Sequence, residues 1–172
     1  NCRMKNCRYF EGVGIHDGSE GTVRNCYFDE CLSGISVRHS SKAWIYDNTV
    51  VNSRVTAEHI VPFGQGLFIE RYSTADIANN IIINNDNEGI YLESSSGSVV
   101  HNYIDNNGHV ALDGNGVYCH NSSFVIMDNL IARNYLYGID VSEQPCKIYQ
   151  NDIRYNNRGG IKVSSMADVD AR

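Results

Sequence analysis

The sequence of 172 residues contains only two prolines and one tryptophan, and it has no apolar run of the roughly 18 residues that a membrane-spanning helix needs. The N-terminus lacks the charged start and apolar stretch of a signal peptide. Lysine and arginine are outnumbered by aspartate and glutamate, 14 to 20, and are scattered along the chain. These absences argue against a membrane span and against a nucleic-acid-binding protein, which needs a basic surface.

The residues that are present predict one all-β domain over 1–172. Hydrophobic residues make up 42% of the chain and charged residues 20%, which at this length is enough for one core. Isoleucine, valine and tyrosine favour strands, while asparagine and the 15 glycines favour tight turns. The chain begins at Asn1, which fits either a processed protein or a fragment of a longer solenoid.

An internal repeat organises the chain. The template stretch sets two asparagines between apolar residues and closes with a Gly-apolar-x-apolar segment: Ile77, Asn80, Ile82, Asn85, Gly89, Ile90 and Leu92. Similar copies begin at Val99, Ile126 and Ile148 downstream, and at Ile45 and Val23 upstream. The basic period is 22 residues, as between positions 77 and 99. Such a period is the sequence signature of a solenoid.

Seven copies fill the chain, because a frayed first copy runs from Met4 through Cys7 and Tyr9 to Gly14-Ile15. Each copy holds three short segments with period-2 alternation, separated by polar corners. Three such strands fit one coil of a triangular solenoid, whose coils stack about 4.8 Å apart. The stack would form three parallel sheets around one apolar core.

The asparagines fall into two columns, one at each of two corners of the coil. An asparagine tolerates the left-handed backbone of a corner, and its amide can hydrogen-bond to the amides above and below it. We therefore expect two structural ladders rather than ligand sites: Asn48, Asn80, Asn102, Asn129 and Asn151 in one, and Asn85, Asn107, Asn134 and Asn156 in the other.

The two asparagine columns, the Gly-Ile-x-Leu segment and the serine-rich turn after it resemble the right-handed parallel β-helix repeats of the pectin-lyase-like superfamily. The resemblance covers essentially the whole chain and is specific for the fold. A leucine-rich repeat has a similar period, but it has one asparagine column and an L-x-x-L-x-L frame. The inward isoleucines and valines and the second column favour the β-helix.

The six cysteines fall at positions that we expect to face the interior: Cys2, Cys7, Cys26, Cys31, Cys119 and Cys146. Cys7 and Cys26 share one column on adjacent coils in this alignment, so either a disulfide or two free buried thiols fits the pattern. The chain has no CxxC or His-Cys spacing that would indicate zinc.

The resemblance directs attention to the Gly-apolar-x-apolar strand, because β-helix polysaccharide lyases, hydrolases and epimerases act along the outer face of that sheet. Outward residues form two columns there, with Phe68, Tyr91, Tyr118, Asp140 and Lys162 in one and Arg38, Glu70, Glu93 and His120 in the other. Exposed aromatic rings can pack against sugars, and the charged groups can bind hydroxyls or move protons. Alternatively, aromatic neighbours and the pairs Arg38–Glu70 and Asp140–Lys162 stabilise the sheet.

We assign substrate binding to Arg38, Phe68, Glu70 and Tyr91, and catalysis to Glu93, Tyr118, His120, Asp140 and Lys162. Glu70 and Glu93 should lie one coil apart, near the carboxyl separation of retaining glycosidases. For a lyase or epimerase, Tyr118, His120 and Lys162 are the candidate base and acid, and Arg38 could neutralise a uronate. The calcium-binding aspartate cluster of pectate lyases and the paired-aspartate motif of polygalacturonases are not recognisable here.

Two longer copies add the segments 54–65 and 108–115 just before this strand, so we expect two loops that wall a cleft over Tyr91 and Glu93. Within the second loop, Asp113-Gly-Asn115-Gly has the oxygen ligands of a Ca²⁺ loop but not the full spaced set, and a tight turn fits it better. We therefore expect no metal and no cofactor.

Two functions fit the sequence. The first is a carbohydrate-binding or polysaccharide-processing module outside the cell or at its surface, with a lyase-, hydrolase- or epimerase-like activity and a neutral or sparsely charged glycan as partner, because the protein is acidic. The second is a non-catalytic structural or filament module that self-associates end to end, because neither end of the repeat array shows a recognisable cap.

Overall fold

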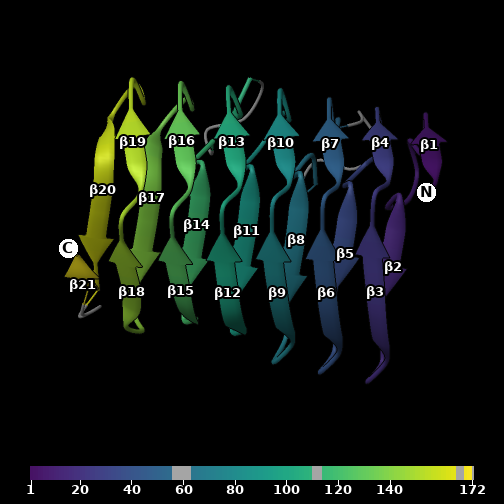
Figure 1. Ribbon diagram of the computed structural model, residues 1–172, viewed down its shortest axis with the longest axis horizontal. Coiled ribbons are helices and arrows are strands. Elements are labelled where there is room, and N and C mark those ends of the chain that lie inside the picture. The colour runs from purple at the N-terminus through teal and green to yellow at the C-terminus, as the bar shows by residue number, and fades with distance from the viewer. Residues whose placement is uncertain (56–62, 110–113, 166–168, 172) are drawn as a thin grey trace.

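The computed structural model describes residues 1–55, 63–109, 114–165 and 169–171. Within these residues the chain forms 21 strands in three sheets of seven, and all of the strand pairs are parallel. The sheets run along a rod that has the N-terminus at one end and the C-terminus at the other (Figure 1). The predicted all-β solenoid of about seven coils with three parallel sheets is confirmed.

We name the sheets A, B and C. Sheet A contains β1 (Arg3–Lys5), β4 (Tyr27–Asp29), β7 (Thr49–Val51), β10 (Ile81–Ile83), β13 (Tyr103–Asp105), β16 (Leu130–Ala132) and β19 (Asp152–Arg154). Sheet B contains β2 (Val13–Ile15), β5 (Ile35–Val37), β8 (Leu67–Glu70), β11 (Ile90–Glu93), β14 (Val117–His120), β17 (Tyr137–Ser142) and β20 (Gly159–Ser164). Sheet C contains β3 (Glu20–Arg24), β6 (Lys42–Tyr46), β9 (Thr74–Ala78), β12 (Ser96–Val100), β15 (Ser123–Met127), β18 (Cys146–Tyr149) and β21 (Val169–Ala171).

Each coil runs from sheet C through sheet A to sheet B, and equivalent residues of successive copies pair across the coils. In sheet A, Ile82 pairs with Val50 on one side and with Ile104 on the other. All three are fully buried, as are the other inward isoleucines, leucines and valines of the central coils. The repeat therefore stacks equivalent side chains of successive coils on one another, and the core is one continuous apolar column.

The asparagine ladders are confirmed, but the residue that forms the ladder is not the residue that has the left-handed backbone, which sequence analysis did not predict. Asn80 N and Nδ2 both donate to Asn102 Oδ1, at 2.9 and 3.0 Å, and Asn102 donates in the same way to Asn129. The left-handed backbone lies one residue earlier, at Asn79 with φ of 56° and at His101 with φ of 56°. In the Asn79-Asn80 pair, the first residue makes the corner and the second makes the ladder.

The predicted alignment of the first copy is wrong, by five residues in the segment from Met4 to Tyr9 and by two residues in the outward strand. Met4 pairs with Phe28, and Val13 pairs with Ile35, so Met4 belongs to sheet A and not to the preceding strand of the coil. The outward strand of this copy is therefore Val13–Ile15. The error arose because cysteines stand where the later copies carry the asparagines that fix the alignment.

The same shift overturns the proposed bridge between Cys7 and Cys26. With Met4 opposite Phe28, Cys2 falls in the column of Cys26, and Cys7 falls in that of Cys31. All six cysteines are free thiols in this structure. Cys2 is exposed rather than inward, because β1 is the edge strand of sheet A.

Candidate functional site

The outer face of sheet B carries the two predicted columns of side chains. Tyr91 pairs with Phe68 on one side and with Tyr118 on the other, and Glu93 pairs with Glu70 and His120. Parallel pairing with one residue pointing out every second position brings these side chains one coil apart on one surface. Sequence reasoning therefore placed them on the correct face and in the correct order.

An aromatic stack runs along the first column. The ring centroids of Phe68 and Tyr91 are 5.0 Å apart, and those of Tyr91 and Tyr118 are 5.3 Å apart. Phe68 is only 2% exposed, since it stacks on Tyr91 and the Arg38 guanidinium lies 4.7 Å from its ring centroid. The prediction of an exposed Phe68 ring is therefore wrong, whereas Tyr91 and Tyr118 remain half-buried and keep part of their surface in solvent.

Four half-buried residues on β11 and β14 form what we call the tyrosine cluster: Tyr91, Glu93, Tyr118 and His120. The Tyr91 hydroxyl donates to Glu93 Oε2 at 3.1 Å. The rings of Tyr118 and His120 are nearly parallel, with centroids 6.1 Å apart. The cluster thus combines flat aromatic surface with a carboxylate and an imidazole on adjacent coils.

His120 is held from the next coil. Its Nδ1 lies 2.9 Å from Ser142 Oγ, and its Nε2 lies 3.8 Å from Glu143 Oε2. A hydroxyl on one ring nitrogen and a carboxylate near the other fix the orientation of the imidazole. His120 is therefore placed to accept or donate a proton at the surface of the sheet.

Tyr91 is a hydrogen-bond donor rather than a base. Burial, and next the negative charge of Glu93, raise the pKa of Tyr91. Both effects penalise the phenolate, so the hydroxyl keeps its proton and its hydrogen bond to Glu93. The binding role that sequence analysis gave to Tyr91 stays a prediction.

Arg38 and Glu70 take part in a charge network beside the cluster. Arg38 Nη2 lies 3.0 Å from Glu11 Oε1, and its Nε lies 3.7 Å from Glu70 Oε1. Arg71 Nε approaches the same Glu70 oxygen at 3.2 Å. The stabilising pair considered as the alternative role of Arg38 and Glu70 is thus present, and Glu70 is buried.

Asp140 and Lys162 form the second predicted ion pair. Lys162 Nζ donates to Asp140 Oδ2 at 2.8 Å, and the ammonium lies 5.5 Å from the centroid of the Tyr137 ring. The hydrogen bond to Asp140 raises the pKa of Lys162, so the amine stays protonated and is poorly suited to act as a base. Asp140 is buried, and Lys162 is bound to it. Neither residue therefore belongs to the tyrosine cluster.

Three residues of this face escaped sequence analysis. Glu11 was missed because the first copy was misaligned, and Glu143 because it follows the strand and enters the turn. Tyr137 was missed because β17 starts two residues earlier than its neighbour β14, relative to the paired positions Val117 and Ile139. The Gly-apolar-x-apolar pattern gives two outward residues for each strand and could not show any of these three.

The two long segments are anchored at the corner between sheets A and B. Arg54 Nη1 donates to Asp86 Oδ1 at 2.7 Å, and Val55 N donates to Asp86 Oδ2 at 3.0 Å. His109 N donates to the backbone carbonyl of Asp86 at 3.0 Å. Both segments are therefore fastened to the coil that carries Tyr91 and Glu93. The predicted cleft walls at 56–62 and 110–113, and the Asp113 ligand position, lie outside the described residues.

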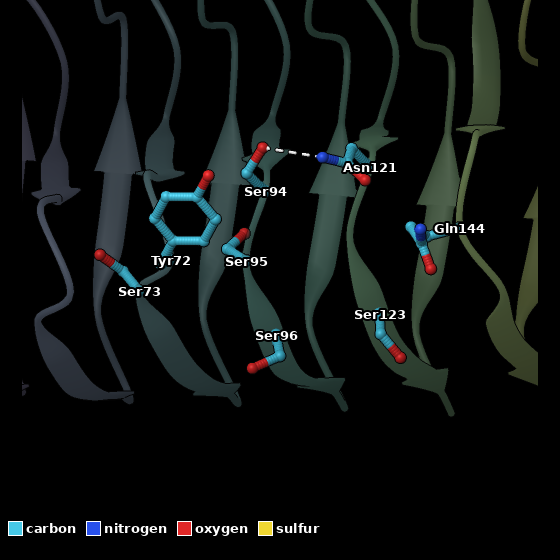
Figure 2. Close-up of a pocket in the computed structure, with 8 residues that line it drawn as sticks. All are labelled: Tyr72, Ser73, Ser94, Ser95, Ser96, Asn121, Ser123 and Gln144. Atoms are coloured by element: carbon cyan, nitrogen blue, oxygen red, sulfur yellow. Dashed lines mark hydrogen bonds between the residues drawn. The ribbon is translucent and has the colours of Figure 1, made fainter.

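A groove of about 350 Å³ lies at the turn from sheet B to sheet C, and sequence analysis did not predict it, since its only sign is a run of serines. Its lining contains hydroxyl and amide groups and no charged side chain: Tyr72, Ser73, Ser94, Ser95, Ser96, Asn121, Ser123 and Gln144. Figure 2 shows Asn121 Nδ2 donating to Ser94 Oγ at 3.2 Å, with Tyr72 at one end of the groove. Ser94 and Asn121 directly follow Glu93 and His120, so the groove adjoins the tyrosine cluster.

In the part of the chain that the structure describes, no three histidine, cysteine, aspartate or glutamate side chains gather in a way that could hold a metal ion. Among the same residues, no helix has the length and apolar character needed to cross a bilayer.

Three parallel sheets, asparagine ladders and one outer face with aromatic and acid–base groups define a parallel β-helix. The family model described as "right handed beta helix region" matches residues 1–124, and the chain belongs to this family. A comparison with curated protein sequences finds no match.

Two solved structures share the fold. The periplasmic alginate epimerase AlgG is 16% identical, with a TM-score of 0.63 over 98% of this chain and 42% of that one. The pectate lyase Pel9A is 14% identical, with a TM-score of 0.61 over 95% of this chain and 53% of that one. The chain thus spans about half or less of the length of either neighbour. At these identities the likeness shows the fold alone.

Proposed function

We propose that the outer face of sheet B binds a glycan across Tyr91 and Tyr118, and that Glu93 and His120 move protons when the glycan is processed. The observation that carries this proposal is the tyrosine cluster, in which stacked rings lie beside a carboxylate and an oriented imidazole. Aromatic faces pack against sugar rings, and a carboxylate and an imidazole can serve as general base and general acid. The activities named for the two structural neighbours support a polysaccharide as the ligand class.

The charge network around Glu70 argues against hydrolysis by a pair of carboxylates. A two-carboxylate hydrolysis would need Glu70 as well as Glu93, but Glu70 is buried and lies between Arg38 and Arg71. A lyase- or epimerase-like proton transfer by His120, with Tyr118 beside it, uses groups that remain partly in solvent. We therefore favour proton abstraction from the sugar over hydrolysis.

The ligand is best described as a sparsely charged glycan. The protein carries a formal charge of −6, which repels polyanions. Arg38 and Lys162 already pair with carboxylates of the chain, so they offer little cationic charge to a dense polyuronate. A glycan with occasional uronates among neutral sugars, of the kind found outside cells or at their surface, suits both the chemistry and the charge.

Tyr118→Ala is expected to weaken glycan binding about tenfold, because it removes one of the two half-buried rings from the platform. His120→Gln should leave binding nearly unchanged and lower any turnover by roughly 10²–10⁴-fold, because it removes only the proton-transfer group. Binding would be measured by titration calorimetry against neutral, mixed and uronate-rich oligosaccharides. Turnover would be followed by the ultraviolet absorbance of an unsaturated uronate and by NMR of the epimer ratio.

Tyr103→Ala is the matched control. Tyr103 is half-buried on sheet A, and its hydroxyl donates to Asp105 at 2.9 Å, much as Tyr91 donates to Glu93. It should not change binding, whereas Tyr72→Ala would report whether the ligand extends into the serine groove. An equal loss of glycan affinity in Tyr103→Ala and Tyr118→Ala would refute the proposed site. So would the absence of binding by the parent protein to any of the glycans.

The alternative function is end-to-end assembly, and one observation favours it. Ile161 and Val163 occupy inward columns of sheet B, yet they are 39% and 47% exposed on β20, the last strand in the order of that sheet. A second copy stacked on this strand would bury them. We expect light scattering to show mass increasing with protein concentration if this function operates, and Val163→Lys to abolish the increase. A concentration-independent monomer would rule it out.

A further inference from the structure

Two buried cysteines meet inside the solenoid, at the corner between sheets B and C. Cys119 points inward from β14, and Cys146 is the first residue of β18, one coil further on. Their sulfur atoms are 2.9 Å apart, and their exposed fractions are 0% and 1%. Both thiols also approach the Ser122 carbonyl, at 3.7 and 3.5 Å. We propose that these two residues are a disulfide site that joins successive coils when the chain folds in an oxidising compartment.

The repeat itself does not require sulfur at these positions. The neighbours of Cys119 in its column are Leu92 and Val141, and Cys146 falls in the column of Ala75 and Phe124. Any small or medium apolar side chain fills such a position. The two thiols nevertheless occur on facing columns at adjacent levels, where their side chains touch, so their pairing is a feature of this chain rather than of the fold.

The two thiols lie within hydrogen-bond distance of each other, and either sulfur could be the donor. The contact with Cys146, and next burial, raise the pKa of Cys119 in the folded chain, so its thiol keeps its proton there. The thiolate is the nucleophile in disulfide exchange. Exchange with an external disulfide therefore takes place before the two thiols are buried together, and either of them can react first.

The oxidant is a small disulfide such as oxidised glutathione. The thiolate of one of the two cysteines attacks one of its sulfurs, which forms a mixed disulfide and releases one glutathione thiolate. The thiolate of the other cysteine then attacks the protein sulfur of this mixed disulfide, which forms the intramolecular bond and releases the second glutathione thiolate. Two electrons pass to the external disulfide, and the two protons lost by the cysteines end on the released thiols.

Burial sets when this exchange can occur. In the folded chain neither sulfur is open to a molecule the size of glutathione. The bond must form while the coil of β18 is still open, and a chain that folds in a reducing compartment keeps both thiols. The cross-link then closes a span of 27 residues, about one coil of the solenoid.

The test is to refold the full chain with oxidised glutathione, block free thiols, digest it and map the peptides by mass spectrometry. We expect one linked peptide that contains Cys119 and Cys146, and four blocked cysteines. The oxidised protein should melt roughly 5–10 °C above the reduced protein, because the cross-link restricts the unfolded chain. The shift should disappear on adding a reductant to the unfolded protein before it refolds.

The variant with Cys119→Val and Cys146→Ala provides the matched control, because both residues occur in the same columns at Val141 and Ala75. It should melt near the reduced parent and show no difference between oxidising and reducing refolding. Cys26→Ser, at a half-buried position, should keep the linked peptide and the full shift. Six free thiols after oxidative refolding, a link between other cysteines, or equal melting temperatures of the oxidised and reduced parent would each overturn the proposal.

Discussion

Asn102→Ala is expected to lower the free energy of unfolding by roughly 3–5 kcal/mol, because it breaks the ladder in the middle of the rod. Asn102 Oδ1 accepts two hydrogen bonds from Asn80, one from its backbone N and one from its Nδ2. Its own Nδ2 lies within hydrogen-bond distance of three oxygens, on Ile77, Val100 and Asn129. Alanine would leave several of these groups without a partner, and they are buried, since Asn102 is only 2% exposed.

The measurement is the urea midpoint and slope of the unfolding transition. Asn157→Ala is the control, because Asn157 is exposed and lies outside both ladders, and it should change stability by no more than about 0.5 kcal/mol. Similar midpoints for the two variants would mean that the ladder does not hold the coils together.

Gly116→Ala is expected to cost about 2–3 kcal/mol by overpacking the corner before β14. A Cβ at this position would lie 2.6 Å from the Gly138 carbonyl oxygen and 2.8 Å from Asn134 Nδ2. Neither group can move freely, since the first belongs to the next coil's backbone and the second to the asparagine ladder. The backbone angle itself is unstrained, so the effect is one of space alone.

Gly160→Ala gives a matched comparison in the same column. Its nearest contact would be Ile153 Cγ2 at 3.7 Å, an ordinary packing distance, because Gly160 lies on the last strand of sheet B. We expect a change within about 0.5 kcal/mol in the same urea titration. A larger loss for Gly160→Ala than for Gly116→Ala would show that coil spacing does not limit this column.

The repeat made most of the fold predictable. Once the Gly-apolar-x-apolar segments that begin at Gly89 and Gly116 are aligned across the inserted residues, the pairing of Tyr91 with Tyr118 follows, as the structure shows. The pattern failed where its marker residues are absent, as in the first copy, where Cys2 and Cys7 replace the asparagines.

The corners show a second limit of pattern reading. The left-handed residue before each ladder position varies in type, and His101 and Tyr155 adopt it as readily as Asn79. Position in the coil, rather than residue type, imposes this conformation. Sequence analysis therefore assigned the left-handed corner to the ladder asparagine, whereas the residue before it adopts that conformation. Only the backbone angles separate the two roles.

Burial on the outer face was the least predictable feature. An outward direction follows from alternation, but exposure depends on what neighbouring columns place over a side chain. Phe68 is covered because Arg38 reaches across it, and Arg38 is drawn there by Glu11 from the misaligned copy. Sequence spacing contains no information on such lateral contacts between long side chains.

The ladder of asparagines also gives the rod a chemical direction. From Asn48 through Asn80 and Asn102 to Asn129, each residue donates from its backbone N and Nδ2 to the Oδ1 of the ladder asparagine on the next higher-numbered coil, the last of which is Asn151. Two copies that stacked would therefore meet head-to-tail, because the two faces of a coil present different groups of the ladder. Such stacking would yield an open chain of subunits, whereas a twofold-symmetric pair would oppose like groups.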